Sequence, residues 1–117
     1  MTYVNLTPHI INVVREDGTV FTIPTSGVEA RVETKYKEFC IVDDNGGDSN
    51  NFILYHQQFG EVENLPHYIL NNIYIVSALV RLALPLRLDV ASPGELIRNS
   101  AGQPIGCRGL VVNPQLF

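Results

Sequence analysis

The sequence predicts an α+β fold in a single domain, built mainly of antiparallel β-sheet hairpins with one or two short helices. Three observations support this prediction. Apolar and polar residues alternate with a period of two through much of the first half, turn residues interrupt the alternation at short intervals, and one stretch near residue 80 consists of good helix formers. A chain of 117 residues has room for one domain, and no repeat or linker marks a boundary within it.

The first half is expected to form hairpins. Ile10–Arg15 is predicted to be a strand, with a tight turn at Glu16-Asp17-Gly18 and a partner strand at Thr19–Ile23. After the turn residues 24–27, two further strands are expected at Val28–Glu33 and Tyr36–Val42.

A polar loop is expected at residues 43–51, where the Asn45-Gly46 pair favours a turn. Its aspartates lack the spacing of an EF-hand, so calcium binding is not expected. Phe52–Phe59 then has the composition of a strand, which Gly60 is expected to end, and Asn72–Val76 that of a buried strand.

The last third contains the expected helix and one more hairpin. Ser77 can cap a helix over residues 78–84, and Pro85 disfavours helical geometry in the residue before it. Strands over residues 95–99 and 104–112 flank the turn at Ser100-Ala101-Gly102.

The charge is unevenly distributed along the chain. The formal net charge is −4, which argues against a protein that coats long nucleic acid. Residues 1–80 hold four Lys or Arg against ten Asp or Glu. Residues 81–117 hold only two acidic residues and four arginines, which are Arg81, Arg87, Arg98 and Arg108. The planar guanidinium group suits phosphate oxygens. The alternative interpretation is a solvated surface with arginines at chance spacing.

The residue types needed for catalysis are scattered. His9, His56 and His67 occur without metal-ligand spacing, and no nucleophile motif accompanies them. The expected role of His9 is a backbone hydrogen bond that fixes the turn after Asn5-Leu6-Thr7-Pro8. Neither a metal nor a cofactor is expected, and the protein is predicted not to be an enzyme.

An anionic nucleotide would be held by side chains, because no glycine loop of the phosphate-binding kind is present. Tyr68, Tyr74 and Phe117 could stack on a base, and Asn99 beside Arg98 could read its edge. Each aromatic residue could equally belong to the core.

The cellular context is predicted from what the sequence lacks. No apolar run reaches the roughly 20 residues that span a bilayer, and the N-terminus does not have the pattern of a secretion signal. A cytoplasmic protein is therefore expected, with Cys40 and Cys107 as reduced, buried thiols.

Four segments resemble those of a known family. They are Val4-Asn5-Leu6-Thr7-Pro8-His9, Ile23-Pro24-Thr25-Ser26-Gly27 with Ala30-Arg31-Val32, Tyr74-Ile75-Val76-Ser77-Ala78-Leu79-Val80 before Arg87-Leu88-Asp89, and Gly102-Gln103-Pro104-Ile105-Gly106-Cys107-Arg108. Together they span nearly the whole chain and are similar to the phage anti-Thoeris sponge proteins, which bind cyclic ADP-ribose isomers and silence the alarm signal made by the host's TIR enzymes.

The resemblance implies a single nucleotide-binding domain over residues 1–117, acting in the host bacterial cytoplasm as a homo-oligomer, a dimer or hexamer. It would capture its ligand without breaking it, and some members are thought to capture cyclic oligonucleotides at a separate surface. Carried onto this chain, Arg108 would hold the pyrophosphate, with Arg98, Asn99 and Arg87 as neighbours. Where the family has its aromatic residue, this chain has Leu82 or Leu86, and residues 109–117 hold no second arginine.

Two other functions remain open at this point. One is an enzyme that cleaves such a nucleotide, with His9 or His67 as acid or base. The other is a small phage structural or assembly protein that uses a strand edge or the apolar segment 110–117 for contacts.

Overall fold

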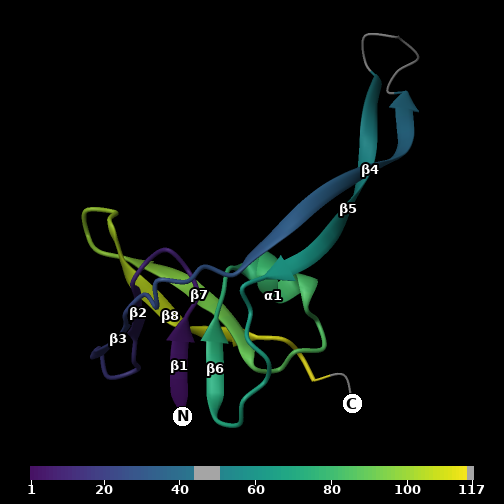
Figure 1. Cartoon of the computed structure of the whole chain (residues 1–117). Helices are drawn as coiled ribbons and strands as arrows, with labels where there is room; N and C mark the ends of the chain where they lie inside the picture. The colour runs from purple at the N-terminus through teal and green to yellow at the C-terminus, as the bar shows by residue number, and fades with distance from the viewer. Residues whose placement is uncertain (44–50, 116–117) are drawn as a thin grey trace. The chain divides into compact units, whose positions relative to one another are not determined.

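The computed structural model describes residues 1–43 and 51–115 and is mostly β-sheet, with a single short helix in those ranges. The elements follow in the order β1 (Thr2–Asn5), β2 (Ile11–Val14), β3 (Val20–Ile23), β4 (Arg31–Asp43), β5 (Asn51–Glu63), β6 (Asn72–Ile75), α1 (Ala78–Ala83), β7 (Val90–Arg98) and β8 (Pro104–Val112). Figure 1 shows their arrangement.

The chain divides into two compact units, one of Met1–Arg31 with Val62–Phe117 and one of Val32–Glu61. The second unit consists of the paired strands β4 and β5, and a two-stranded sheet has no core of its own. The hydrophobic core therefore lies in the first unit, as expected for one small domain.

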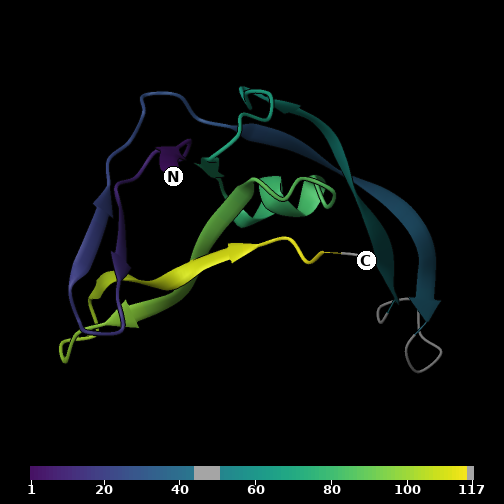
Figure 2. The same cartoon turned by 90° about the horizontal axis from the view of Figure 1, so that it is seen from below.

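The sheet of the first unit is mixed and barrel-like, with strand order β1-β6-β7-β8-β2-β3. Figures 1 and 2 show these strands curving round a common interior. The hairpins β2–β3 and β7–β8 are antiparallel as predicted, but β1 pairs with β6, β6 with β7, and β2 with β8 in parallel. The expectation of a mainly antiparallel sheet is thus correct for the hairpins and wrong for the pairs that join them.

The core is made by the inward faces of these strands. Five buried residues form its centre: Ile11, Ile23, Ile75, Ala91 and Cys107. The partly buried side chains of Val13, Phe21, Ile73 and Leu110 pack against them. The central strands have consecutive buried residues, Tyr74-Ile75 on β6 and Val90-Ala91-Ser92 on β7, whereas on β8 the buried Cys107 is followed by the exposed Arg108. This confirms the buried position expected for Cys107, whereas Cys40, on β4, is exposed and was wrongly expected to be buried.

Hydrogen bonds of Asn5 close the sheet between the end of β1 and the end of β3. Asn5 is 1% exposed, and its Nδ2 donates to the carbonyls of His9 and Ile23 at 2.7 and 3.2 Å. Its Oδ1 accepts from the backbone N and Oγ of Thr7, and its carbonyl accepts from Ser26. His9 thus fixes the turn through its backbone carbonyl, as expected. The segment interpreted as a turn begins at Asn5, which is the last residue of β1.

Two glycines account for strands that the sequence indicated poorly. β5 continues through Gly60. A Cβ atom at this position would lie only 3.3 Å from Cβ of Glu33, so glycine lets the two strands pass close to each other. β7 begins at Val90 rather than near residue 95, and it passes through Gly94, where a Cβ atom would collide with the carbonyl of Arg108. Both glycines permit close approach of a neighbouring strand instead of ending their own.

The helix is as predicted. Ser77 Oγ accepts from the backbone N of Val80 at 3.2 Å, and α1 ends at Ala83, two residues before Pro85. The two strands expected at 28–33 and 36–42 instead form the single strand β4. The predicted loop at 43–51 lies outside the described residues except for its ends, which belong to β4 and β5.

Candidate functional site

The candidate site is a groove where the parallel strands β1, β6 and β7 begin. Two loops border it, residues 64–71 before β6 and residues 84–89 before β7. Backbone bonds hold the first loop in place, because Thr2 donates to the carbonyl of Asn71 and Asn72 donates to that of Ile69. Asn71 adopts a positive φ of 67°, which turns the chain sharply into β6.

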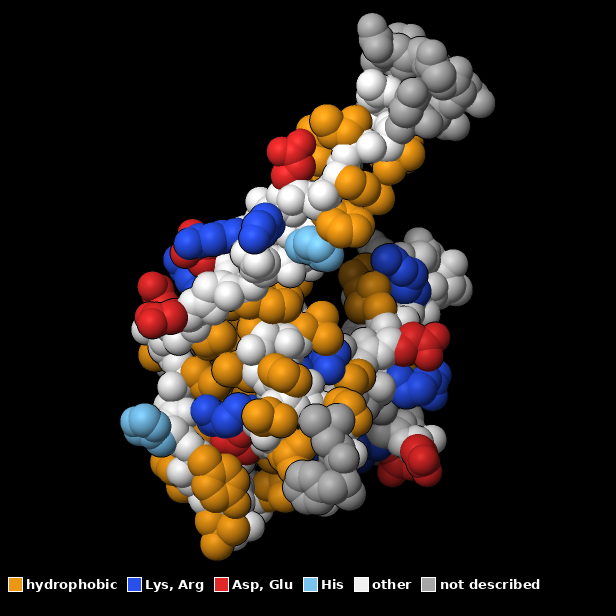
Figure 3. All heavy atoms as spheres, turned by 90° about the vertical axis from the view of Figure 1, so that its right-hand side faces the viewer, with side chains coloured by type: hydrophobic (Ala, Val, Ile, Leu, Met, Phe, Trp, Pro, Cys, Tyr) orange, Lys and Arg blue, Asp and Glu red, His pale blue; other side chains and the backbone are white. Residues whose placement is uncertain are grey.

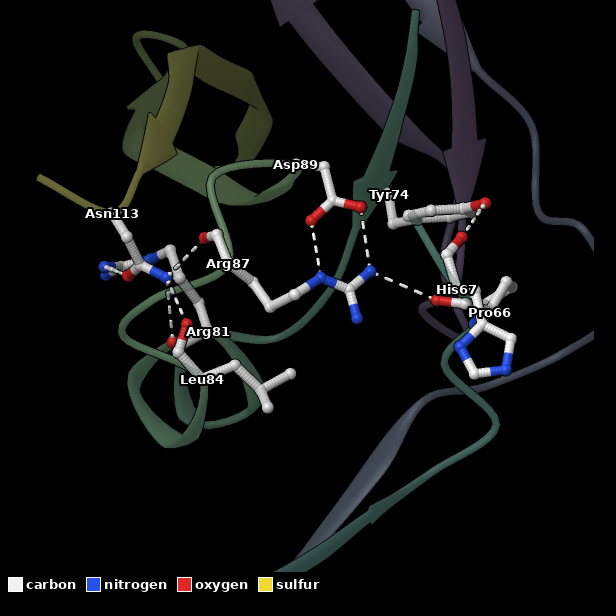
Figure 4. Close-up of polar contacts among 8 residues, drawn as sticks. All are labelled: Pro66, His67, Tyr74, Arg81, Leu84, Arg87, Asp89 and Asn113. Carbon is white, nitrogen blue, oxygen red and sulfur yellow. Dashed lines mark hydrogen bonds and ion pairs between the residues drawn. The ribbon is translucent and has the colours of Figure 1, made fainter. Parts of the chain in front are cut away.

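The Arg87 side chain joins the two loops. Its Nε and Nη2 contact Asp89 Oδ1 and Oδ2 at 2.7 and 2.8 Å, and Nη2 also donates to the carbonyl of Pro66 at 3.1 Å (Figure 4). Asp89 is 4% exposed, so its charge is compensated by this pair rather than by water. The carboxylate in turn raises the pKa of Arg87 above its ordinary value, mainly through the hydrogen bond.

Tyr68 lies at the centre of the groove. Two adjoining cavities share Tyr68, Leu88 and Asp89. One, of about 360 Å³, is also lined by Leu86 and Arg87, and the other, of about 250 Å³, by Met1, Leu70, Asn71, Asn72 and Ile73. We call these two cavities together the Tyr68 groove.

The Tyr68 groove has the three kinds of group that a nucleotide needs. Tyr68 is 63% exposed and offers a ring for stacking, and Asn71 and Asn72 line the far cavity with side-chain amides. Arg87 has five N–H donors, and its three bonds among the described residues leave the Nη1 hydrogens for a ligand. Because the Asp89 carboxylate offsets much of its charge, Arg87 would contribute directed hydrogen bonds to a ligand more than net positive potential.

Behind the groove, Arg81 is part of the internal structure. Its Nε donates to Ser92 Oγ at 2.9 Å and its Nη1 to Asn113 Oδ1 at 3.2 Å. Asn113 Nδ2 donates to the carbonyls of Arg81, Leu84 and Arg87, which lie at the end of α1 and in the loop that follows (Figure 4). The two arginines nearest α1 therefore bind the protein's own groups, which an excess of positive charge in the sequence does not reveal.

The other predicted site residues lie on the β7–β8 hairpin. Arg98 Nη1 donates to the carbonyl of Gly102 at 2.8 Å, and Asn99 Oδ1 accepts from the backbone of Ala101 and Gln103. Arg108 lies opposite Glu95, with Nε 4.0 Å from its carboxylate and 70% of its side chain exposed. Arg98 and Asn99 hold the hairpin turn, and all three residues are exposed.

None of the three described cavities brings together any two of the four predicted residues. Arg87 precedes β7 and Arg98 ends it, and the strand from Val90 to Arg98 spans about 26 Å at the usual rise per residue. This exceeds what two arginine side chains can bridge around a compact ligand. Arg98, Asn99 and Arg108 form one group and Arg87 another.

The predicted stacking residues also separate. Tyr74 is 2% exposed and its hydroxyl donates to the carbonyl of His67, so its ring belongs to the core. Phe117 lies outside the described residues. Of the two described residues, Tyr68 borders a cavity with the predicted Arg87. Sequence reasoning missed Asp89 and Asn113, although an aspartate two residues after an arginine is a signal for a local ion pair.

A third cavity, of about 400 Å³, lies over β2, β7 and β8. Its lining is largely apolar and includes His9, Leu96, Pro104, Ile105 and Cys107. The Cys107 thiol lies 3.5 Å from the Asn12 carbonyl and serves there as a buried donor. This cavity brings none of the predicted arginines together.

Two classes of site can be assessed over the described ranges 1–43 and 51–115. Those residues contain no group of three or more His, Cys, Asp or Glu placed to hold a metal ion. They also contain no helix long and apolar enough to cross a membrane. Of the aspartates considered for calcium binding, Asp44 and Asp48 lie outside the described residues, and Asp43 is the last residue of β4.

Comparison with known proteins adds no assignment: the chain matches no family model, no curated protein and no solved structure.

Proposed function

We propose that the protein is a phage anti-defence sponge that binds a cyclic ADP-ribose-type signalling nucleotide without cleaving it and so blocks TIR-based Thoeris immunity. It acts in the host bacterial cytoplasm, needs no cofactor, and works as a homo-oligomer. The proposal rests on the sequence resemblance and on the Tyr68 groove. A related capacity for cyclic oligonucleotides belongs to the same proposal, at another surface.

The observation that carries the proposal is the pairing of Tyr68 with Leu86 and Arg87 around one cavity. In the resembling family an aromatic residue is expected near position 82 or 86, where this chain has leucine. Tyr68, from a different loop, provides a ring beside Leu86, so the groove regains the stacking surface that the sequence lacks at that position. Its larger cavity, of about 360 Å³, is within the range of small-ligand sites.

The proposed site uses the remaining arginines from a second copy of the chain. Arg98 and Arg108 lie at the far end of β7 from Arg87 in their own chain, so they meet a ligand in the Tyr68 groove only across an interface. Arg108 would contact the pyrophosphate, with Arg98 and Asn99 beside it. Binding of this kind requires affinity rather than turnover, and the ligand leaves unchanged.

The decisive experiment mixes the purified protein with a TIR-derived cyclic ADP-ribose, heats the complex and identifies the released compound. Recovery of intact ligand in proportion to protein supports sequestration. Loss of ligand with time would instead indicate the cleaving enzyme, and no detectable binding would overturn the proposal. Native mass spectrometry of the unheated complex gives subunit count and ligand mass together.

One observation favours a second function. The paired strands β4 and β5 expose many large apolar side chains, as a small phage structural or assembly protein would for contacts. Co-purification with virion components, together with indifference to nucleotides, would support that alternative.

A further inference from the structure

The cavity over β2, β7 and β8 lies at the other end of β7 from the Tyr68 groove. The parallel strands β2 and β8 both begin beside this cavity, and β7, which starts at the Tyr68 groove, reaches it near its last residues. Its volume is about 400 Å³, and we call it the β2–β8 cavity. Open ends of barrel-like sheets are among the places where proteins bind small molecules.

An inward-facing position of the sheet is left uncovered at the β2–β8 cavity. Ile11 and Cys107, which belong to the core, form part of its lining. Leu96 is paired directly with Cys107 and therefore points to the same face of the sheet, yet Leu96 is 51% exposed. The described residues of the chain thus do not fill the interior at this end.

Two further apolar side chains lie at the rim of the cavity. The paired residues of β7 and β8 skip Ile105, where the register of the two strands shifts. Such a bulge re-aims a side chain and is common at the rims of barrels. Ile105 is 48% exposed, and Ile10, which directly precedes β2, is 60% exposed. Three large apolar side chains therefore surround one opening that leads to the core.

The polar groups of the β2–β8 cavity are few. No Lys, Arg, Asp or Glu is among the described residues that line it. The Cys107 thiol donates to the Asn12 carbonyl, and Asn12 Oδ1 accepts from the Thr22 hydroxyl, so these groups are already bonded within the protein. The imidazole of the exposed His9 can form a hydrogen bond with a ligand at the rim. An anionic ligand would lose water here without gaining a charged partner in the lining.

We propose that the β2–β8 cavity binds a compact, uncharged aromatic molecule with one polar atom. The ring of this molecule lies against Leu96 and Ile105 above the core, and its polar atom faces His9 at the rim. Aromatic groups with a single polar atom suit a site that is apolar at one end and wet at the other. Binding removes the exposed apolar side chains from water, which favours the complex.

The test is a titration of the full chain with indole, an uncharged aromatic molecule with one N–H group. Isoleucine and leucine methyl groups labelled with ¹³C report the place of binding by NMR. We expect saturable shifts of the Ile10, Leu96 and Ile105 methyls, with a dissociation constant below about 1 mM. Indole-3-carboxylate adds a negative charge to the same ring and should bind roughly tenfold more weakly or less.

The titration must also separate the cavity from the other apolar surfaces of the protein. Hydrophobic side chains gather along β4 and β5 (Figure 3), where Ile41 and Leu54 are exposed. Leu88 lines the Tyr68 groove, which contains an aromatic ring. The methyls of Ile41, Leu54 and Leu88 should shift less than those of the cavity and should not saturate.

Leu96→Trp places a larger side chain in the cavity and should weaken indole binding by about tenfold or more. Val20→Trp introduces the same side chain at a half-exposed position of β3 outside the cavity lining, and should bind like the wild type. Thermal unfolding of both variants shows whether they are folded. If Leu96→Trp is not folded, Ile105→Asn takes its place and should weaken binding by about fivefold.

Four results would overturn the proposal. One is the absence of saturable shifts at the cavity methyls, which a side chain of a second copy seated in the cavity would also produce. Another is a set of shifts centred on Leu88 or on β4 and β5. Unchanged affinity in the folded cavity variant would place indole elsewhere, and equal affinity for indole-3-carboxylate would contradict the preference for an uncharged ligand. Indole carries no phosphate, so a failure here leaves the sponge proposal untouched.

Discussion

Arg87 holds Asp89 in a two-point ion pair in which the carboxylate is almost completely buried and the guanidinium is partly exposed. This pair fixes the loop before β7 against the loop before β6, through the bond from Arg87 to the carbonyl of Pro66. An arginine predicted to bind a ligand thus also supports the protein, and its two roles must be separated by experiment.

Arg87→Ala should lower the free energy of unfolding by about 3 kcal/mol, because it leaves the buried Asp89 carboxylate unpaired. The pKa of Arg87 is raised, so its stabilising contribution is fully present below its ordinary pKa and is lost only as the pH rises through the higher folded value. The cost should therefore be equal at pH 6 and pH 9 in urea unfolding. Arg87→Gln with Asp89→Asn should cost less than Arg87→Ala, and a double variant that costs more would show that the pair is not what links the loops.

Arg108→Ala should leave stability within about 0.5 kcal/mol of wild type, since its exposed contact with Glu95 is weak. If Arg108 holds a pyrophosphate, the same change should weaken nucleotide binding by about 1.5–3 kcal/mol, or roughly 10- to 150-fold. Isothermal titration calorimetry measures the effect. Lys37→Ala is the matched control and should bind like the wild type, while unchanged affinity of the Arg108 variant would remove that residue from the site.

Tyr68→Ala should weaken nucleotide binding by about 1–3 kcal/mol, while Tyr68→Phe keeps the ring and most of the affinity. Tyr68 is 63% exposed, so neither change should unfold the protein. Ile69→Ala, at an exposed position of the same loop, is the control in the same titration. Equal loss in the alanine and phenylalanine variants would point to the hydroxyl rather than to stacking.

Asn113→Ala should lower the free energy of unfolding by about 1–3 kcal/mol, because it leaves carbonyls at the end of α1 without the amide that satisfies them. Thermal unfolding followed by circular dichroism would detect the loss. Gln115→Ala, two residues further and exposed, should unfold at the wild-type temperature. A stable Asn113 variant would mean that water replaces the amide.

Local patterns predicted much of the fold. The β2–β3 hairpin, the Ser77 cap and the end of α1 before Pro85 all follow from residues within a few positions of one another. The parallel pairs could not be predicted in this way, because the pairing of β1 with β6 joins residues about 70 positions apart. Gly60 was misleading for the same reason, since it accommodates a neighbour, Glu33, that is distant in the sequence.

The candidate site was predicted only in part. The charge distribution drew attention to Arg81, Arg87, Arg98 and Arg108, and Asn99 was added as a neighbour of Arg98. Neither argument carries information on which of these side chains face the same space. The partner of Arg87 is two residues away, whereas Tyr68 reaches the groove from a loop almost 20 positions earlier. The sequence alone does not show that the Tyr68 ring lies beside Leu86, because the two residues belong to loops that only the fold brings together.

Gly106 sets the distance between β2 and β8, because a Cβ atom there would lie only 2.7 Å from the carbonyl oxygen of Asn12. Val13 faces Cys107 across the same contact, so the thiol and the core beneath it depend on that narrow spacing. Even one methyl group at position 106 would push β8 away from β2 at this point and admit water to the interior.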